Sequence, residues 1–118
     1  MIYFVGAGCG APDLITVRGQ RLLEQADVVI YAGSLVNPAL LEVCKPQCRI
    51  YNSAEMTLDE ILQVMTEAAD KLVVRLHTGD PSLYGAIQEQ IDALDNLGMA
   101  YEVCPGVSSM SGAAAALK

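Results

Sequence analysis

Residues 2–12 read IYFVGAGCGAP, an apolar run that passes directly into a cluster of three glycines. The apolar run is of strand-forming type and predicts a short buried strand. The glycines behind it predict a tight turn, because glycine adopts backbone conformations that other residues resist. Strands that read as unbroken apolar runs are typical of parallel sheets covered on both faces. The segment therefore predicts the first strand and turn of an α/β fold.

Four further apolar runs follow the same pattern, at residues 27–32, 49–51, 71–77 and 100–104. Segments with helical signals separate them, so strands and helices alternate along the chain. This order predicts an α/β fold whose five-stranded, mostly parallel sheet is flanked by helices and covered on both faces. We find no internal repeat and no linker, and we expect one domain.

The helix signals lie at the expected ends of these segments. Thr16 is a natural cap for the first helix, and Asn37 followed by proline is typical of a second helix start. Thr57 and Glu60 form a capping box, in which hydroxyl and carboxylate satisfy each other's backbone donors. Gly98 is expected to end the helix that precedes the last strand.

The composition excludes several classes of protein. The chain has 118 residues, 53% of them hydrophobic and 18% charged, which excludes a disordered segment. Seven basic residues against fourteen acidic ones give a net charge of −7. The basic residues are scattered singly, so we expect no nucleic-acid partner. The acidic residues concentrate on expected helices, where we predict solvated faces.

Targeting and metal signals are equally sparse. No apolar run approaches the roughly 20 residues of a membrane span, and the first residues lack a basic segment, so we expect no membrane partner and a cytoplasmic location. Cys9, Cys44, Cys48 and Cys104 form no CxxC pair, and His77 is remote from them in sequence. Reduced, unpaired thiols and no metal site are therefore expected.

Four unusual segments follow predicted strands, at residues 6–12, 33–34, 78–81 and 105–109. They are rich in Gly, Pro, Ser and Thr. Parallel strands end at one edge of their sheet, where open α/β sheets bind ligands. The four segments together predict a ligand site at that edge.

Several interpretations of these segments stay open. Residues 6–11 satisfy the glycine pattern of dinucleotide-binding turns, but the acidic residue that should follow the second strand is absent. A nicotinamide cofactor and a ligand-free turn remain alternatives. Asp80, Ser108 and Ser109 could serve only as helix caps, and His77 could contact a substrate or rest in a hydrogen bond. The sequence shows no set of residues that could act together as general acid and base. The pattern therefore favours a binding site for a cofactor that carries the reactivity itself.

The segments at residues 5–19, 26–36, 75–85 and 105–109 resemble the motifs of the tetrapyrrole methylase family, in the family's order. The resemblance covers the whole chain and implies an S-adenosylmethionine-dependent C-methyltransferase. Residues 31–36 and 74–81 are most similar to the members that methylate C-11 of precorrin-4 or cobalt-precorrin-4 in cobalamin biosynthesis. The alternatives are a uroporphyrinogen-III or other precorrin C-methyltransferase, a nucleotide-binding oxidoreductase domain, and a non-catalytic binding module.

The resemblance also implies site residues. Those that would contact S-adenosylmethionine are Cys9, Thr78, Gly79, Asp80, Leu83, Ser108 and Ser109. Those beside the trough for the anionic tetrapyrrole would be Gly33, Ser34 and His77. Homodimers are usual in the family, so a homodimer is expected.

Two departures from the family pattern limit these expectations. The family's Gly-Pro-Gly turn is Gly8-Cys9-Gly10 in this chain, and Ala11 stands where many members carry an acid. No catalytic residue is therefore assigned. Members of the family carry a second domain that closes over the cofactor. Residues 1–118 are expected to be the N-terminal α/β domain alone, and residues 113–118 to be the beginning of a helix that has been cut.

Overall fold

The computed structural model describes residues 1–7, 15–32, 36–77 and 88–104. They form a five-stranded sheet in the order β3-β2-β4-β1-β5, and every pairing between neighbouring strands is parallel. The predicted α/β class, strand number and parallel arrangement are confirmed. The strands are β1 (Ile2–Gly6), β2 (Val28–Tyr31), β3 (Arg49–Asn52), β4 (Val73–His77) and β5 (Tyr101–Cys104).

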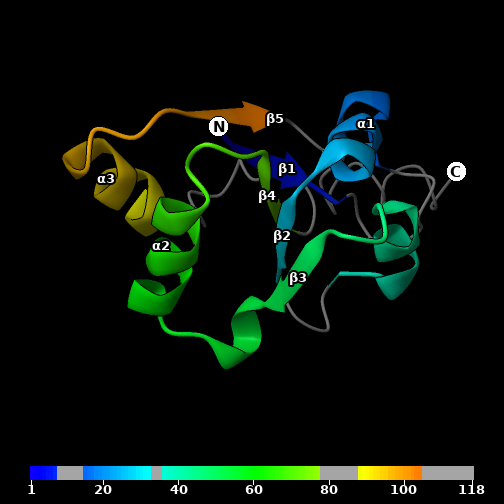
Figure 1. The fold of residues 1–118 in the computed structure, drawn as a ribbon, viewed down its shortest axis with the longest axis horizontal. Helices are drawn as coiled ribbons and strands as arrows, with labels where there is room; N and C mark the ends of the chain where they lie inside the picture. The colour runs from blue at the N-terminus through cyan, green and yellow to red at the C-terminus, as the bar shows by residue number, and fades with distance from the viewer. Residues whose placement is uncertain (8–14, 33–35, 78–87, 105–118) are drawn as a thin grey trace, which may run out of the picture.

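Helices cover both faces of this sheet (Figure 1). Helix α1 (Val17–Gln25) and the 3-10 helix η3 (Pro38–Val43) lie on one face, which we call the α1 face. Helices α2 (Leu58–Glu67) and α3 (Gln88–Asn96) lie on the other, the α3 face. A short 3-10 helix, η4 (Ser53–Glu55), connects β3 to α2. The alternation predicted from the sequence is therefore present as a three-layer arrangement.

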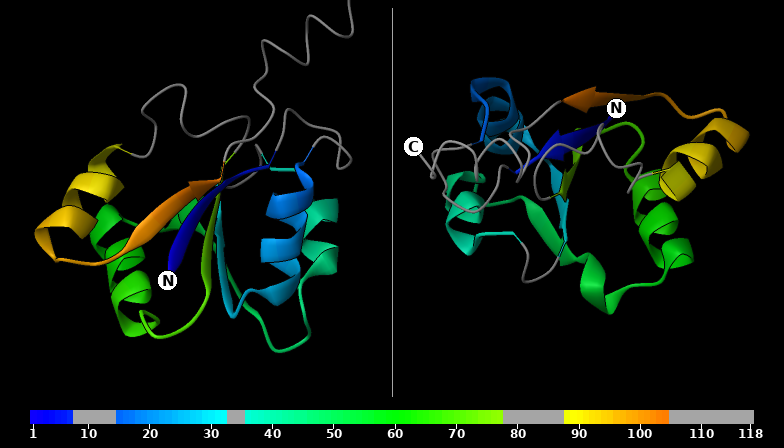
Figure 2. Two further views of the ribbon diagram at one scale, coloured as in Figure 1. Left: turned by 90° about the horizontal axis from the view of Figure 1, so that it is seen from above. Right: turned by 180° about the vertical axis from the view of Figure 1, so that it is seen from behind.

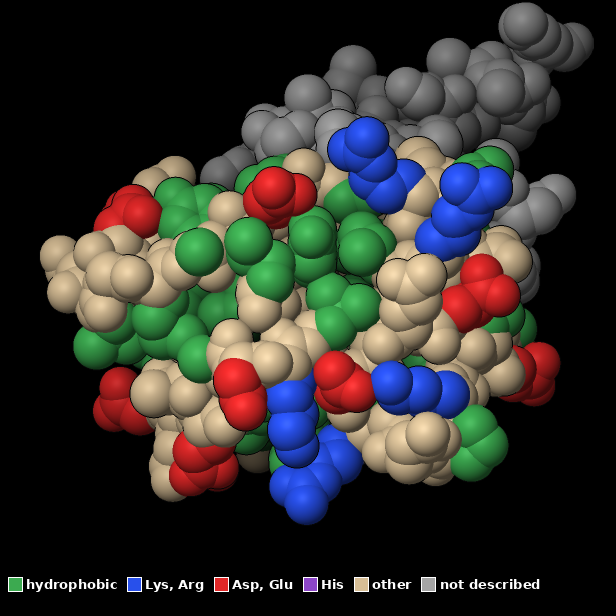
Figure 3. Space-filling view, turned by 45° about the horizontal axis from the view of Figure 1, so that its top comes forward, with side chains coloured by type: hydrophobic (Ala, Val, Ile, Leu, Met, Phe, Trp, Pro, Cys, Tyr) green, Lys and Arg blue, Asp and Glu red, His purple; other side chains and the backbone are tan. Residues whose placement is uncertain are grey.

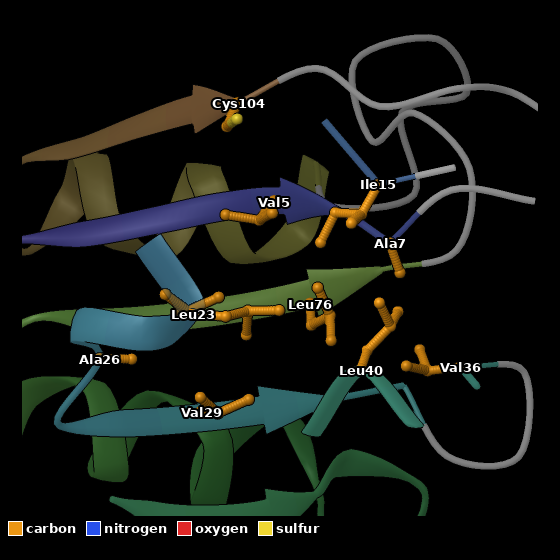
Figure 4. Packing of buried hydrophobic residues seen from close by; sticks show 11 residues of the cluster. Val5, Ala7, Ile15, Leu23, Ala26, Val29, Val36, Leu40, Leu76 and Cys104 are labelled. Atoms are coloured by element: carbon orange, nitrogen blue, oxygen red, sulfur yellow. The ribbon is translucent and has the colours of Figure 1, made fainter. Parts of the chain in front are cut away.

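Each face has its own apolar core. On the α1 face, Val5, Leu76 and Val29 from three strands pack with Leu23 of α1 and Leu40 of η3 (Figure 4). On the α3 face, alternate residues of the same strands pack against the two helices. The strands contribute Ile2, Phe4, Val28, Ile30 and Val73 to this cluster, and α2 and α3 with the C-cap of α2 contribute Ile61, Met65, Ala68 and Leu94. Side chains that alternate between two buried faces explain why the strand sequences read as unbroken apolar runs.

The predicted caps are largely confirmed. Thr16 accepts a hydrogen bond from the backbone N–H of Gly19 at 3.0 Å, and Thr57 and Glu60 form the expected capping box. Gly98 has a φ of +68°, the left-handed conformation that ends a helix. Asn37 caps its segment through Ala39, but the segment is a six-residue 3-10 helix with one buried residue, Leu40. The predicted helix start is therefore present, but it begins a short 3-10 segment.

Burial on both faces is confirmed for β1, β2 and β4 and wrong for the edge strands β3 and β5. Arg49 and Ile50 of β3 are exposed, as is Glu102 of β5. These strands have a neighbour on one side only, and the helices cover the middle of the sheet. Charged residues within both short runs agree with edge positions.

The surface of the described residues is mixed in charge. Acidic and basic side chains are interspersed around apolar ones on the face shown in Figure 3. The acidic residues predicted to be solvated are exposed on or beside α2 and α3, for example Asp59, Glu67 and Asp92. None of the described helices is long and apolar enough to cross a membrane.

Candidate functional site

The described strands end together at one edge of the sheet. Gly6, the last residue of β1, pairs with His77, the last residue of β4. In the same register Tyr31 of β2 pairs with Leu76, and Cys104 of β5 pairs with Val5. The arrowheads of the strands accordingly point in a common direction (Figure 2). The four segments singled out in the sequence all continue from this carboxyl edge.

The neighbouring strands β1 and β4 are followed by helices on opposite faces of the sheet. After β1 the chain enters α1 on one face, and after β4 it enters α3 on the other. Adjacent strands with divergent connections form a topological switch point, where open α/β sheets bind their ligands. The carboxyl ends of β1 and β4 are therefore the candidate site.

One of the ten site residues expected from the sequence, His77, lies within the described part of the chain, at this switch point. The other nine fall outside the described residues: Cys9, Gly33, Ser34, Thr78, Gly79, Asp80, Leu83, Ser108 and Ser109. The expected cofactor contacts and most of the expected trough remain predictions.

His77 carries an unpaired polar atom. Its carbonyl oxygen accepts a hydrogen bond from the backbone N–H of Ala7, which ties the ends of β4 and β1 together. Its ring nitrogen Nε2 is buried and has no hydrogen-bond partner among the described residues. Burial and, secondarily, the charge of Arg75 lower the pKa of His77 from 6.5 to about 4. The imidazole is therefore neutral at physiological pH, with one nitrogen free to bond a ligand.

Arg75 lies two residues before His77 in β4 and is only 4% exposed. Its Nε donates to Oε1 of Gln90 in α3 at 3.1 Å, and Nη1 donates to the carbonyl oxygens of Ile30 at 3.2 Å and Leu76 at 3.4 Å. Burial lowers the pKa of Arg75 to about 10, so the group stays positively charged. No described carboxylate forms an ion pair with it.

Arg75 and Gln90 were not identified as functional candidates from the sequence. A usable signal existed, because Arg75 is the one charged residue inside the apolar run of residues 72–76. Arginine is rarely buried without compensating hydrogen bonds, so its presence in a central strand indicates a specific role. The partners themselves could not be inferred, since Ile30 is 45 residues away along the chain.

The described thiols are poor nucleophiles. Cys44 and Cys48 form no disulfide within the described residues, and Cys104 is buried with Sγ 3.8 Å from the Thr16 hydroxyl. Burial raises the pKa of the Cys44 thiol, and burial together with the neighbouring Cys44 raises that of Cys48 to about 11. Within the described ranges no three potential ligands gather around a metal position.

A cavity of about 360 Å³ lies away from the switch point, beside the first residues of β2 and β3 and against α2. Asp27, on its wall, is held by Lys45 at 2.8 Å and by the backbone N–H of Leu72 at 3.0 Å. Both oxygens of this carboxylate therefore accept hydrogen bonds from within the fold. We place the candidate site at the carboxyl edge and not in this cavity, because parallel sheets bind ligands at the former.

The amino-acid sequence of the chain is similar to those of known proteins. The family of tetrapyrrole (corrin/porphyrin) methylases matches residues 1–118. The chain is 58% identical to a cobalt-precorrin-4 C(11)-methyltransferase from Methanocaldococcus jannaschii, over 99% of this chain and 46% of that protein. It is 52% identical to a precorrin-4 C(11)-methyltransferase from Mycobacterium tuberculosis, over 99% of this chain and 47% of that protein.

The fold of the chain is also similar to solved structures of methyltransferases. The chain is similar to a cobalt precorrin-4 methyltransferase with a TM-score of 0.92 and 50% identity, over 98% of this chain and 49% of that one. It is also similar to a uroporphyrin-III C-methyltransferase from Thermus thermophilus in complex with S-adenosyl homocysteine, with a TM-score of 0.75 and 34% identity, over 92% of this chain and 45% of that one. The chain thus spans about half the length of the relatives it matches.

Proposed function

Because the chain belongs to the tetrapyrrole methylase family, we propose that it is the N-terminal half of an S-adenosylmethionine-dependent methyltransferase acting on C-11 of cobalt-precorrin-4 or precorrin-4, in cobalamin biosynthesis. One observation carries the proposal: the 58% identity to the cobalt-precorrin-4 C(11)-methyltransferase extends over 99% of this chain. The second half of such an enzyme would complete the cofactor cleft. The proposal includes a cytoplasmic homodimer.

The described residues suit a cofactor that brings its own reactivity. The carboxyl ends of β1, β2, β4 and β5 carry no carboxylate within the described ranges, and the imidazole of His77 is neutral. The bound cofactor would supply a methyl group on a sulfonium, whose leaving group needs little acid–base help. The task left for the protein is to align donor and acceptor, which can itself contribute much of the rate acceleration.

Residue roles follow from the resemblance of the motifs. We assign cofactor contacts to Cys9, Thr78, Gly79, Asp80, Leu83, Ser108 and Ser109, and trough positions to Gly33, Ser34 and His77. His77 is at the switch point, and the buried imidazole nitrogen without a partner supports a ligand contact there. We assign no catalytic base.

Binding and turnover test the proposal in the two-domain protein. Calorimetry should detect S-adenosylhomocysteine, and labelled methyl should pass from S-adenosylmethionine to cobalt-precorrin-4 or precorrin-4. Comparing these two substrates decides the metal state, since relatives of both kinds are similar to this chain. The absence of both binding heat and a thermal shift with S-adenosylhomocysteine would contradict the proposal. Methylation of uroporphyrinogen III in place of the precorrins would assign another reaction of the family, and NADH binding would indicate an oxidoreductase domain.

A further inference from the structure

Two polar side chains, Arg75 and His77, are buried at the end of β4 although they contribute no apolar surface to the core. Within the described part of the chain, Nε2 of His77 is buried without a hydrogen-bond partner, and Arg75 carries a buried positive charge without an ion-pair partner. Side chains two residues apart in a strand share a face, so both lie on the α3 face of the sheet. A buried nitrogen without a hydrogen bond and a buried charge without an ion pair are both costly unless a partner or a ligand satisfies them.

Hydrogen bonds fix Arg75 in place from three directions. Gln90 holds Nε from α3, and the carbonyl oxygens of Ile30 and Leu76 hold Nη1 from β2 and β4. These contacts join the penultimate residues of two neighbouring strands to the helix that packs over them. The guanidinium therefore stabilises the strand end from which His77 projects.

The charge at this place favours one kind of ligand. A positive charge in a poorly solvated position attracts anions and repels cations more strongly than it would in water. The last residues of β1, β2, β4 and β5 include no carboxylate to cancel it. A carboxylate bound close to this guanidinium would therefore be stabilised.

We propose that His77 donates a hydrogen bond from Nε2 to a carboxylate of the bound tetrapyrrole, and that Arg75 is the positioning residue that holds β4 and supplies positive potential for that carboxylate. This inference rests on the proposed function, because it names the part of the substrate that the same site recognises. A neutral imidazole has one N–H donor, which suits this contact once the tautomer places the proton on Nε2. Burial, with a contribution from Arg75, keeps the ring in that neutral form.

The test uses the two-domain protein with four variants and one control. His77→Leu removes the donor, and His77→Gln restores an amide N–H near the position of Nε2. Arg75→Met removes the charge, and Arg75→Lys keeps it without the guanidinium's fork of donors. Arg21→Met is the matched control, since Arg21 is exposed on the α1 face. For each protein we would measure KM and kcat for the tetrapyrrole and the Kd of S-adenosylhomocysteine.

We expect His77→Leu to raise KM by about tenfold, the loss typical of a hydrogen bond to a charged group, with little change in kcat or in the Kd of S-adenosylhomocysteine. His77→Gln should recover most of that loss, which a purely structural role would not predict. Arg75→Met should raise KM further, and Arg75→Lys should lie between Arg75→Met and the parent protein. If Arg75→Met does not fold, the His77 variants and Arg75→Lys still decide the matter.

A substrate analogue supplies an independent measurement. The parent protein should discriminate against a tetrapyrrole whose carboxylates are esterified, and His77→Leu should discriminate less. Unchanged KM in His77→Leu, unchanged discrimination, or an effect on S-adenosylhomocysteine in place of the tetrapyrrole would overturn the inference. A parent protein that neither binds S-adenosylhomocysteine nor methylates a precorrin would instead overturn the proposed function.

Discussion

Arg75 and Gln90 form a hydrogen bond of 3.1 Å between Nε and Oε1 that joins the central strand β4 to helix α3. Both side chains are buried, with exposed fractions of 4% and 8%. Gln90 is the one described side-chain acceptor for this guanidinium, and the other acceptors are backbone carbonyls. This hydrogen bond anchors α3 to the sheet within an otherwise apolar contact between them.

Gln90→Leu should test this anchor. Removing the acceptor leaves a buried charged donor unsatisfied, which we expect to lower the free energy of unfolding by about 1–3 kcal/mol. Urea denaturation measures the change. Gln63→Leu is the control, because Gln63 is exposed on α2 and bonds only to exposed Glu67. Equal effects of the two substitutions would contradict the prediction.

Thr57→Ala should weaken the start of α2. The Thr57 hydroxyl accepts from the N–H of Glu60 at 3.2 Å, and the Glu60 carboxylate accepts from the N–H of Thr57 at 3.1 Å. Losing the cap should cost about 1 kcal/mol by thermal or urea unfolding. Thr66→Ala should cost less, because the Thr66 hydroxyl donates to a carbonyl within the same helix. A larger loss in Thr66→Ala would be the contrary outcome.

Gly19→Ala should destabilise the chain although alanine is the better helix former. A Cβ at Gly19 would lie 3.0 Å from Cγ1 of Val5, 3.1 Å from Cγ1 of Ile15 and 3.2 Å from the Thr16 hydroxyl. Overpacking against a buried strand should cost about 1–2 kcal/mol in urea unfolding, outweighing the gain in helix propensity. Gln20→Ala, at the next and exposed position, should be neutral or stabilising. A stabilised Gly19→Ala protein would show that the neighbours yield without cost.

The pKa of His77 predicts a pH dependence of stability. Burial lowers this pKa from 6.5 to about 4, so the unfolded chain binds more protons between these values. Stability should be fully present above pH 6.5 and decline as the pH falls toward 4, by on the order of 2–3 kcal/mol. His77→Gln should remove this decline when urea unfolding is compared at pH 7.5 and 4.5.

Asp27 limits how far the pH can be lowered in that comparison. Its hydrogen bond to Lys45 lowers its pKa below 3.8, so its contribution is lost only at more acidic pH. A decline of equal size in the His77→Gln protein and its parent would assign the pH dependence to other groups.

The 118-residue chain should fold alone yet bind S-adenosylmethionine poorly. Two apolar clusters pack strands against helices within the described residues, which supports a cooperative thermal transition. The proposed cofactor cleft needs the second domain, so calorimetry should detect much weaker binding of S-adenosylhomocysteine than in the two-domain protein. Methyl transfer by the chain alone would contradict this prediction.

Local signals in the sequence predicted most of the secondary structure. The apolar runs marked all five strands, and Thr16, Thr57 and Gly98 marked helix ends, because caps and strand propensity depend on neighbouring residues. The 3-10 form of Pro38–Val43 was not predicted, because Asn37 followed by proline marks a helix start and not the type of helix that follows. The expected cofactor residues follow from motif resemblance and remain predictions.

The sequence by itself determined the parallel α/β class, the helix caps and the edge at which ligands are expected, because periodicity and turn chemistry are local properties. The tertiary structure alone decided the strand order β3-β2-β4-β1-β5, which places β4 between β1 and β2. That order brings Arg75 to Ile30 and Gln90 and leaves Nε2 of His77 buried without a partner. Hydrogen bonds between distant segments depend on which strands become neighbours, and no local pattern in the chain records that choice.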